Sequence, residues 1–425
     1  MSMKHYPALG ESLYEATLPN GLRVRLIPKK DFATKIAFLA VDFGSIDTSF
    51  TLDGKDYRVP DGIAHYLEHK MFDLPDEDAS AQFAQWGASA NAFTSYSMTA
   101  YHFSCTDHFE ESLALLLRMV TTPYFTEETV EKERGIIAQE ILMYEDSAES
   151  RVYEDLFGIM FPEHPISVPI AGTVESISHI TADMLYTCHR AFYHPANMVL
   201  CVAGDVDWEQ LLALAEAHTP AQSSPLPTRN YGKITPATER RESRRTMEIS
   251  MPTFCFGFAC PPPAEGESAM HREIVGELAS EILVGESSSL YTRLYEEGII
   301  DSDFSVGYES VKDACLLSIS GDSDTPEIVY DAILEEAQRL TKEGFDPQWF
   351  TRLLHSSHGR RIRDLDSFSS ICYRISAYEF EGYEYFNFSP DYQSVTAEDV
   401  LDFLSKVISG SNSAVAVIQP KERDL

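Results

Sequence analysis

Residues 62–72 read GIAHYLEHKMF, and this stretch decides how the rest of the chain is interpreted. Its apolar residues recur at helical spacing, which predicts a helix. Positions i and i+4 of a helix lie on one face, one turn apart, so His65 and His69 can reach the same metal ion. Glu68 lies beside them, near the open side of such an ion, where a carboxylate can take a proton from water. The order His-x-x-Glu-His is the inverse of the better-known His-Glu-x-x-His zinc motif.

A catalytic zinc ion usually binds three protein ligands and keeps one position open, so this motif requires a third ligand. The helix predicted at residues 126–147 contains EKERGIIAQEILMYE (131–145), which offers Glu133 and Glu140. These glutamates are seven residues apart and therefore face the same way, two turns apart. One of them can bind the metal while the other orients a histidine or holds water. The alternative is a surface helix with two solvated histidines, but the apolar neighbours of the motif favour a metal site.

The segments on either side of the motif predict both strands and helices. In EATLPNGLRVRLIPKK (residues 15–30), Asn20-Gly21 between two apolar-rich stretches predicts a β-hairpin. SANAFTSYSMTAYHFSCT (residues 89–106) alternates and is rich in β-branched and aromatic residues, so we expect a strand there. Amphipathic helices follow, and MVLCVAGDV (residues 198–206) closes this half of the chain as a strand.

The order of these elements recurs in the second half of the chain. TAEDVLDFLSKVI (residues 396–408) leads to SAVAVIQP (413–420), much as TADMLYTCHRAFY (181–193) leads to MVLCVAGDV. We therefore expect an α+β fold of two homologous domains, each a mostly antiparallel sheet flanked by helices. The segment between the halves is rich in Pro, Ser and charged residues, which is typical of a linker. The predicted boundaries are 1–218 for the N-terminal domain with the metal motif, 219–246 for the linker, and 247–425 for a C-terminal domain without the motif.

The composition limits the partners and the compartment. The 425 residues include 67 acidic and 33 basic side chains, and the resulting net charge of −34 repels nucleic acid and anionic membranes. No apolar run reaches the about eighteen residues that a membrane span needs, and the N-terminus has no signal-peptide core, so we expect a cytoplasmic protein. The seven cysteines are scattered and mostly have apolar neighbours, which indicates buried, reduced thiols.

Further motifs extend the pattern beyond the metal helix. They are the hairpin NGLRVRLIPKK, the sequence Asn91-Ala92-Phe93-Thr94, the helix with two glutamates seven residues apart, and FYHPANMVLCVAGDVD (192–207). Together with the metal helix they resemble the pitrilysin/insulinase family of inverted-motif zinc peptidases, which includes the mitochondrial processing peptidase. The chain is most similar to the short bacterial processing-protease subunits. The resemblance implies that Glu140 is the third zinc ligand, that Glu133 is a supporting catalytic acid, and that each chain holds one Zn²⁺.

The resemblance also implies how a substrate is bound. In the family, the strand around Asn91 lines the site and pairs with an extended peptide, so Asn91, Ala92 and Phe93 are candidate substrate contacts. Asn91 could equally be an edge residue without a ligand. Many members carry an Arg and a Tyr in the second half that contact the substrate or the developing oxyanion. The best-aligned positions here are Tyr295 and Asp301, which do not match, so the oxyanion partner stays open.

The leading hypothesis is a zinc metalloendopeptidase that hydrolyses peptides or unfolded segments, with Glu68 activating the zinc-bound water. The family builds a closed chamber from four such domains, so this two-domain chain is expected to form a homodimer or a heterodimer with a homologous subunit. One alternative is a non-catalytic assembly subunit, but such subunits usually lose part of the motif, and His65, Glu68, His69 and Glu140 are all present. Another is a metal-dependent hydrolase with a non-peptide substrate.

Overall fold

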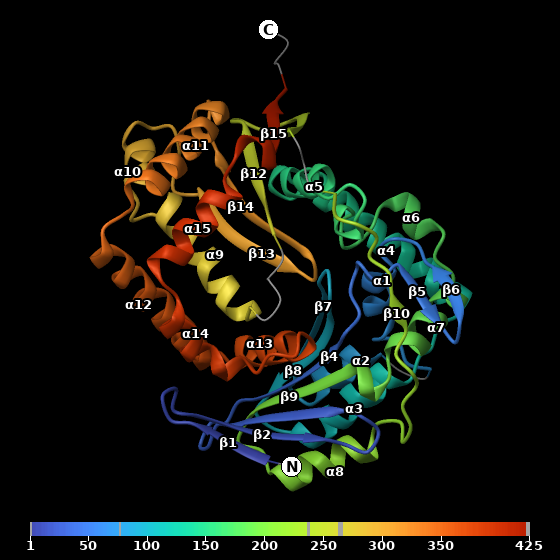
Figure 1. The fold of residues 1–425 in the computed structure, drawn as a ribbon. Helices are drawn as coiled ribbons and strands as arrows, with labels where there is room; N and C mark the ends of the chain where they lie inside the picture. Colours follow the sequence, from blue (N-terminus) through green and yellow to red (C-terminus); the bar gives the residue numbers. More distant parts are fainter. Residues whose placement is uncertain (1, 76–77, 236–238, 262–266, 422–425) are drawn as a thin grey trace. The chain divides into compact units, whose positions relative to one another are not determined.

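The computed structural model describes residues 2–75, 78–235, 239–261 and 267–421 (Figure 1). The chain divides into two compact units, and each unit draws on separate stretches of the sequence. The contiguous boundaries 1–218, 219–246 and 247–425 therefore stay a prediction. The first unit is made of Met1–Ile141, Pro169–Tyr231 and Ile362–Phe386, and the second of Leu142–Val168, Gly232–Arg361 and Asn387–Leu425.

A mostly antiparallel sheet forms the centre of the first unit. Within the described ranges its strand order is β1-β2-β3-β9-β4-β8-β7, and only β3 and β9 pair in parallel. A small sheet of order β10-β5-β6 lies beside it in the same unit. The strands are β1 (Ser2–Tyr6), β2 (Glu11–Thr17), β3 (Arg23–Pro28), β4 (Lys35–Val41), β5 (Ser49–Leu52), β6 (Lys55–Arg58), β7 (Ser89–Thr94), β8 (Thr99–Cys105), β9 (Met198–Gly204) and β10 (Thr228–Arg229).

Helices cover both faces of the large sheet. On one face, Leu39, Tyr101 and Leu200 are fully buried in a hydrophobic core shared with the helices of the N-terminal half. The opposite face is covered by α13, whose Glu379 accepts hydrogen bonds from Arg25 of β3 at 2.7 and 3.2 Å. The helices of this unit are α1 (Ile63–Lys70), α2 (Ala79–Gln85), α3 (Phe109–Thr121), α4 (Glu127–Glu145), α6 (Val174–Ser178), α7 (Ala182–Phe192), α8 (Trp208–Ala217) and α13 (Phe368–Phe380). The part of α4 that follows Ile141 belongs to the second unit.

The first predicted hairpin is confirmed. Strands β2 and β3 pair antiparallel with Thr17 opposite Arg23, and the Asn20-Gly21 turn lies between them. Gly21 has φ 90°, a left-handed conformation that costs little only for glycine. The side chain of Asn20 accepts a hydrogen bond from the amide of Leu22 at 3.1 Å, which stabilises the turn.

The prediction of one strand over residues 89–106 is wrong, because this segment is a hairpin. It folds into β7 and β8, with Thr94 opposite Thr99. The turn has no Gly, Pro or Asn, so it carries no composition signal. The hydroxyl of Ser95 replaces that signal, since it accepts from the amide of Met98 at 3.1 Å and donates to its carbonyl at 3.0 Å.

The second unit repeats the central topology of the first. In the described part of this unit the strand order is β11-β15-β12-β14-β13, with only β11 and β15 parallel. This order and polarity match β3-β9-β4-β8-β7, which confirms the two homologous α+β domains. The elements are β11 (Arg241–Met247), β12 (Thr253–Cys260), β13 (Ser305–Val311), β14 (Ala314–Asp322), β15 (Ser413–Pro420), α5 (Ala148–Met160), α9 (Ala269–Val284), α10 (Ser289–Glu296), α11 (Pro326–Glu343), α12 (Pro347–Arg363, to Arg361), α14 (Phe388–Ser394) and α15 (Ala397–Val407).

A buried asparagine supports the repeat at the level of single hydrogen bonds. Asn197, just before β9, donates its side-chain amide to the carbonyls of Asp42 (3.0 Å) and Phe192 (2.9 Å). Asn412, just before β15, donates in the same way to Ala259 (2.6 Å) and Val407 (3.3 Å). In the first domain this amide connects the end of α7 to the end of β4, and in the second it connects the end of α15 to β12. β4 and β12 are the strands that pair antiparallel with β9 and β15, respectively. This shared detail is difficult to explain without duplication.

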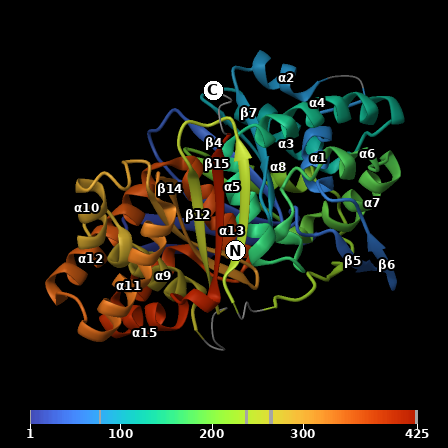
Figure 2. The ribbon, with the colours of Figure 1, turned by 90° about the horizontal axis from the view of Figure 1, so that it is seen from above.

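The two domains exchange one helix each. Helix α13 follows α12 in the C-terminal half but packs on β9 and β4 of the first unit. Helix α5 follows α4 in the N-terminal half but packs on β15 and β12 of the second unit (Figure 2). These helices and strands occupy equivalent positions in the two repeats, so the exchange is reciprocal.

Other predictions have mixed outcomes. All seven cysteines are buried and free, as expected. The segment 219–246 includes β10 and the start of β11, apart from residues 236–238, which lie outside the described residues. Arg241 in this segment donates to the carbonyls of Ile159 (2.9 Å) and Met160 (2.8 Å) at the end of α5. None of the described helices has the length and apolar composition needed to cross a bilayer.

Candidate metal centre

The metal helix α1 begins at a glycine that no other residue could replace without strain. Gly62 has φ 86°, and a Cβ atom there would lie 2.3 Å from the carbonyl oxygen of Ala171. Gly172 approaches from the other side, and its Cβ would lie 2.6 Å from the carbonyl oxygen of Asp61. The close backbone contact fixes the start of α1, and therefore the position of His65 one turn later.

A second contact fixes α1 against α4. The hydroxyl of Tyr66, which is fully buried, donates to the carbonyl oxygen of Val130 on α4. Helix α4 buries Val130, Ile137 and Ile141 along one side, and this turns its glutamates toward α1. The helix faces that carry the candidate ligands thus meet because apolar residues at helical spacing are buried beside them.

The two histidines and Glu140 form a group that could hold a metal ion. Nε2 of His65 lies 3.6 Å from Oε1 of Glu140, and Nε2 of His69 lies 3.4 Å from its Oε2. One donor atom from each residue lies within 4.8 Å of the others. Zinc with N and O ligands at about 2.0–2.2 Å in a tetrahedron separates those ligands by about 3.4 Å. Two imidazoles and one carboxylate at these separations therefore fit Zn²⁺.

The ionisation of this group favours metal binding by the carboxylate. Hydrogen bonds with His65 and then His69 hold the pKa of Glu140 well below its usual range, so this ligand is ionised. Burial works against the protonation of His69, but its hydrogen bonds with Glu133 and Glu140 outweigh burial and raise the pKa of His69 to about 9. A metal ion bound here would displace the proton between His69 and Glu140, because the metal ion and the proton compete for the same nitrogen and oxygen atoms.

Glu133 lies behind His69. Its Oε1 is 2.9 Å from Nδ1 of His69, and this hydrogen bond lowers the pKa of Glu133. An ionised Glu133 can only accept, so Nδ1 carries the hydrogen and Nε2 faces Glu140. This is the carboxylate–histidine contact that typically orients a zinc ligand. Glu140 thus lies between the two histidines and Glu133 lies behind His69, which is the arrangement that the family resemblance implies.

Glu68 is directed toward strand β7. Its Oε2 accepts a hydrogen bond of 2.6 Å from the hydroxyl of Thr94, and the residue is only 8 % exposed. Burial raises the pKa of Glu68, while the Thr94 hydroxyl and the neighbouring histidines oppose the shift. Thr94 ends the Asn91-Ala92-Phe93-Thr94 motif, but the sequence alone predicted no role for it. Its position in that motif was the only feature of the sequence that could have indicated one.

The predicted substrate residues lie on an edge strand but on different faces of it. β7 ends the strand order, so one side of its backbone has no neighbouring strand among the described residues. Ala92 packs against the core on the side of α1. Phe93 points to the opposite face, where its ring lies 5.8 Å from that of Tyr373 and 6.0 Å from that of Phe38. Asn91 is exposed, and its side chain accepts from the amide of Ala92 at 2.9 Å.

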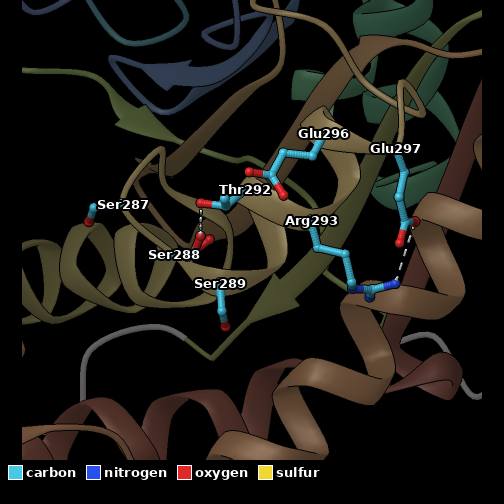
Figure 3. A pocket seen from close by; sticks show the side chains of 7 residues that line it. All are labelled: Ser287, Ser288, Ser289, Thr292, Arg293, Glu296 and Glu297. Carbon is cyan, nitrogen blue, oxygen red and sulfur yellow. Dashed lines mark hydrogen bonds and ion pairs between the residues drawn. The ribbon is translucent and has the colours of Figure 1, made fainter.

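Tyr295 and Asp301, the positions that align best with the Arg and Tyr of many family members, lie in the second unit. Tyr295 is 52 % exposed on α10, and Asp301 caps the amide of Asp303 at 2.9 Å. Arg293 approaches Glu297 at 3.9 Å, and both line an open surface pocket of about 510 Å³ (Figure 3). The rest of the pocket is lined by Ser287, Ser288, Ser289, Thr292 and Glu296. These contacts are within the second unit and give no role to Arg293.

Comparison with known proteins gives consistent matches. The model "Insulinase (Peptidase family M16)" matches residues 50–174, and "Peptidase M16 inactive domain" matches residues 179–356. The uncharacterized zinc protease YmfH of Bacillus subtilis (strain 168) is 37% identical, and the match covers 98% of each chain. The uncharacterized zinc protease SCO5738 of Streptomyces coelicolor is 26% identical, over 95% of this chain and 89% of the relative.

Solved structures show the same fold. The crystal structure of an M16-like peptidase from Alicyclobacillus acidocaldarius superimposes with a TM-score of 0.91 at 30% identity, covering 97% of this chain and 99% of that one. A protease from Helicobacter pylori has the same fold with a TM-score of 0.84 at 19% identity, over 96% and 99% of the two chains. A duplicated α+β fold with an inverted histidine motif and an acidic partner defines a zinc-protease type of protein. The chain belongs to the insulinase family of these proteins, peptidase family M16.

Proposed function

We propose that this chain is a zinc-dependent endopeptidase that hydrolyses peptides or unfolded segments, with His65, His69 and Glu140 as the zinc ligands. The observation that carries the proposal is the convergence of two Nε2 atoms and one carboxylate at separations that suit a tetrahedral ion. When bound, zinc polarises the scissile carbonyl and makes water more acidic. The remaining roles belong to residues of the chain.

Glu68 is the general base in this proposal. Thr94 occupies its Oε2, so Oε1 is the oxygen that takes the proton from water and later gives it to the leaving amine. The raised pKa that burial gives this carboxyl brings it closer to neutral pH, where both proton transfers are efficient. Glu133 keeps Nε2 of His69 free for the metal by holding the hydrogen on Nδ1.

The edge strand β7 is the proposed substrate site. An extended peptide can pair with its free side through backbone hydrogen bonds, which give affinity without a strict sequence requirement. Asn91, Ala92 and Phe93 are the positions that would make these contacts. Since Phe93 and Ala92 face opposite ways, a bound peptide would present alternate side chains to the two faces of the sheet.

A dimer is the proposed active form. In the family, four domains of this kind enclose the substrate, and this chain supplies two. The second half has Tyr295 and Asp301 where many members have Arg and Tyr, so the missing contacts are expected from another chain. We propose a homodimer or a heterodimer with a homologous subunit, acting in the cytoplasm.

The test of the function uses Glu68→Gln, because glutamine keeps the size of the side chain but cannot accept a proton. Turnover of an unstructured quenched-fluorescent peptide should fall by about 10² or more, as expected for loss of a general base. Bound zinc, measured by elemental analysis, should stay at one per chain. The control is Glu131→Gln, since the side chain of Glu131 is 70% exposed on α4 and forms a surface ion pair with Arg134. Near-normal cleavage by Glu68→Gln, or zinc-loaded wild type that cleaves no peptide, would refute the proposal.

A further inference from the structure

We propose that Thr94 is a positioning residue that holds the carboxylate of Glu68 in its working orientation, and that it does so from the strand that binds the substrate. The inference rests on the proposed function. It concerns a residue that is neither a metal ligand nor a proton acceptor. The observation behind it is the 2.6 Å hydrogen bond from the Thr94 hydroxyl to Oε2 of Glu68.

The environment of Glu68 makes this hydrogen bond important. Glu68 is 8 % exposed, so water supplies little of the hydrogen bonding that an ionised carboxylate needs. The hydroxyl of Thr94 donates a hydrogen bond to this carboxylate. A short bond to one oxygen fixes the rotation of the carboxylate plane and leaves the other oxygen available. Orientation of a catalytic base contributes to rate because a misdirected carboxylate cannot reach the proton.

The hydroxyl of Thr94 is itself kept directed at Glu68 by the residues around it. Thr99 lies opposite Thr94 across the hairpin, and the two hydroxyl oxygens are 3.5 Å apart. Thr99 is fully buried and gives its only hydroxyl hydrogen to the carbonyl of Phe43 at 2.8 Å. Thr99 therefore has no hydrogen for Thr94, and the hydrogen of Thr94 is free for Glu68.

Burial keeps the hydroxyl of Thr99 in this arrangement. Thr99 is fully buried, so its hydroxyl cannot turn away from the carbonyl of Phe43 without breaking a buried hydrogen bond. The neighbour of Thr94 is therefore held in place, and the hydroxyl of Thr94 is left to serve Glu68.

The location of Thr94 connects the base to the substrate strand. Thr94 is the last residue of β7, two positions after Ala92 and on the same face, the one toward α1. A peptide that pairs with β7 is thus aligned by the strand that also orients the base. The side chain that contacts Glu68 moves with the backbone that would hold the scissile bond.

The test compares Thr94→Val, which keeps the shape and removes the hydroxyl, with Thr94→Ser, which keeps the hydroxyl. For an unstructured quenched-fluorescent peptide we expect kcat of Thr94→Val to fall by about 10- to 100-fold, the range for loss of a hydrogen bond to a charged group, with KM changed by less than about twofold. Thr94→Ser should recover kcat to within about threefold of wild type. Thr51→Val is the matched control, because Thr51 also donates to a carboxylate at 2.6 Å, that of Asp56, on the separate small sheet.

Two further measurements distinguish positioning from a purely structural role. Zinc content and affinity should be unchanged in Thr94→Val, since Thr94 does not contact the metal group. In the Glu68→Gln background, Thr94→Val should cause little additional loss, because a positioning residue acts only through the base. Thr94→Ala repeats the experiment if the valine variant folds poorly. A kcat of Thr94→Val within about twofold of wild type, or losses that multiply in the double variant, would overturn the proposal.

A crystal structure of the Thr94→Val variant separates failure of this proposal from failure of the proposed function. The Glu68 carboxylate should leave the position it has in wild type, and an unchanged carboxylate would overturn the positioning role even without any activity measurement. Wild-type protein that binds zinc but cleaves no peptide would instead remove the proposed function. The two outcomes come from different samples and different readouts.

Discussion

Replacing Glu133 with glutamine tests whether the two glutamates of α4 act differently. The hydrogen bond between Nδ1 of His69 and Oε1 of Glu133 is 2.9 Å long, between side chains that are 23% and 17% exposed. Such a bond to a charged group contributes about 1.5–3 kcal/mol and one between neutral groups about 0.5–1.5 kcal/mol. The substitution should therefore remove about 1–1.5 kcal/mol, which corresponds to an approximately tenfold weaker affinity for zinc.

The assay is competition for zinc with a chromogenic chelator at constant pH, with Glu131→Gln as the exposed control on the same helix. Glu140→Gln removes a ligand instead of its support, so its zinc affinity should fall much further than that of Glu133→Gln. The reasoning is refuted if Glu133→Gln loses as much affinity as Glu140→Gln, which would exchange their roles. It is also refuted if Glu133→Gln binds zinc like the control, which would mean that the contact does not support His69.

Two further predictions follow from the site and from the domain count. Protons compete with zinc for His69, whose pKa the hydrogen bonds with Glu133 and Glu140 raise to about 9 despite burial. Below that pH each zinc ion must displace a proton, so zinc affinity should rise about tenfold per pH unit between about pH 6 and 8; an affinity independent of pH would contradict this. The proposed dimer should appear in light scattering as twice the 47.7 kDa chain mass, and a monomer with robust peptidase activity would exclude it.

Local patterns allowed much of the fold to be predicted. The Asn20-Gly21 turn and the spacing of His65 and His69 depend on a few neighbouring residues, and both are confirmed in the structure. The turn between β7 and β8 was missed because Ser95 closes it through its side chain, without the Gly or Asn on which turn prediction depends. A hydroxyl can stabilise a turn whose composition looks like that of a strand.

Long-range features of the site and fold were harder to predict. The contact between Thr94 and Glu68 depends on the register of β7 and on the docking of α1, which no local periodicity encodes. The segment 219–246 has a composition typical of a linker, yet Arg241 to Met247 form a strand because β15, far along the chain, offers a parallel edge. The pairing of residues so distant in sequence overrides local propensity.

The reciprocal exchange of α5 and α13 has a consequence for synthesis on the ribosome. The last strand of the first sheet ends at Gly204, but the helix that covers Phe38 and Cys201 ends at Phe380. The ribosome adds about 5–20 residues per second, so this face of the sheet stays uncovered for roughly 10–35 s during translation. The domain with the zinc motif therefore finishes folding only when the other half of the chain is nearly complete. A damaging substitution in residues 368–380 would act first on the domain with the zinc motif, about 300 residues upstream.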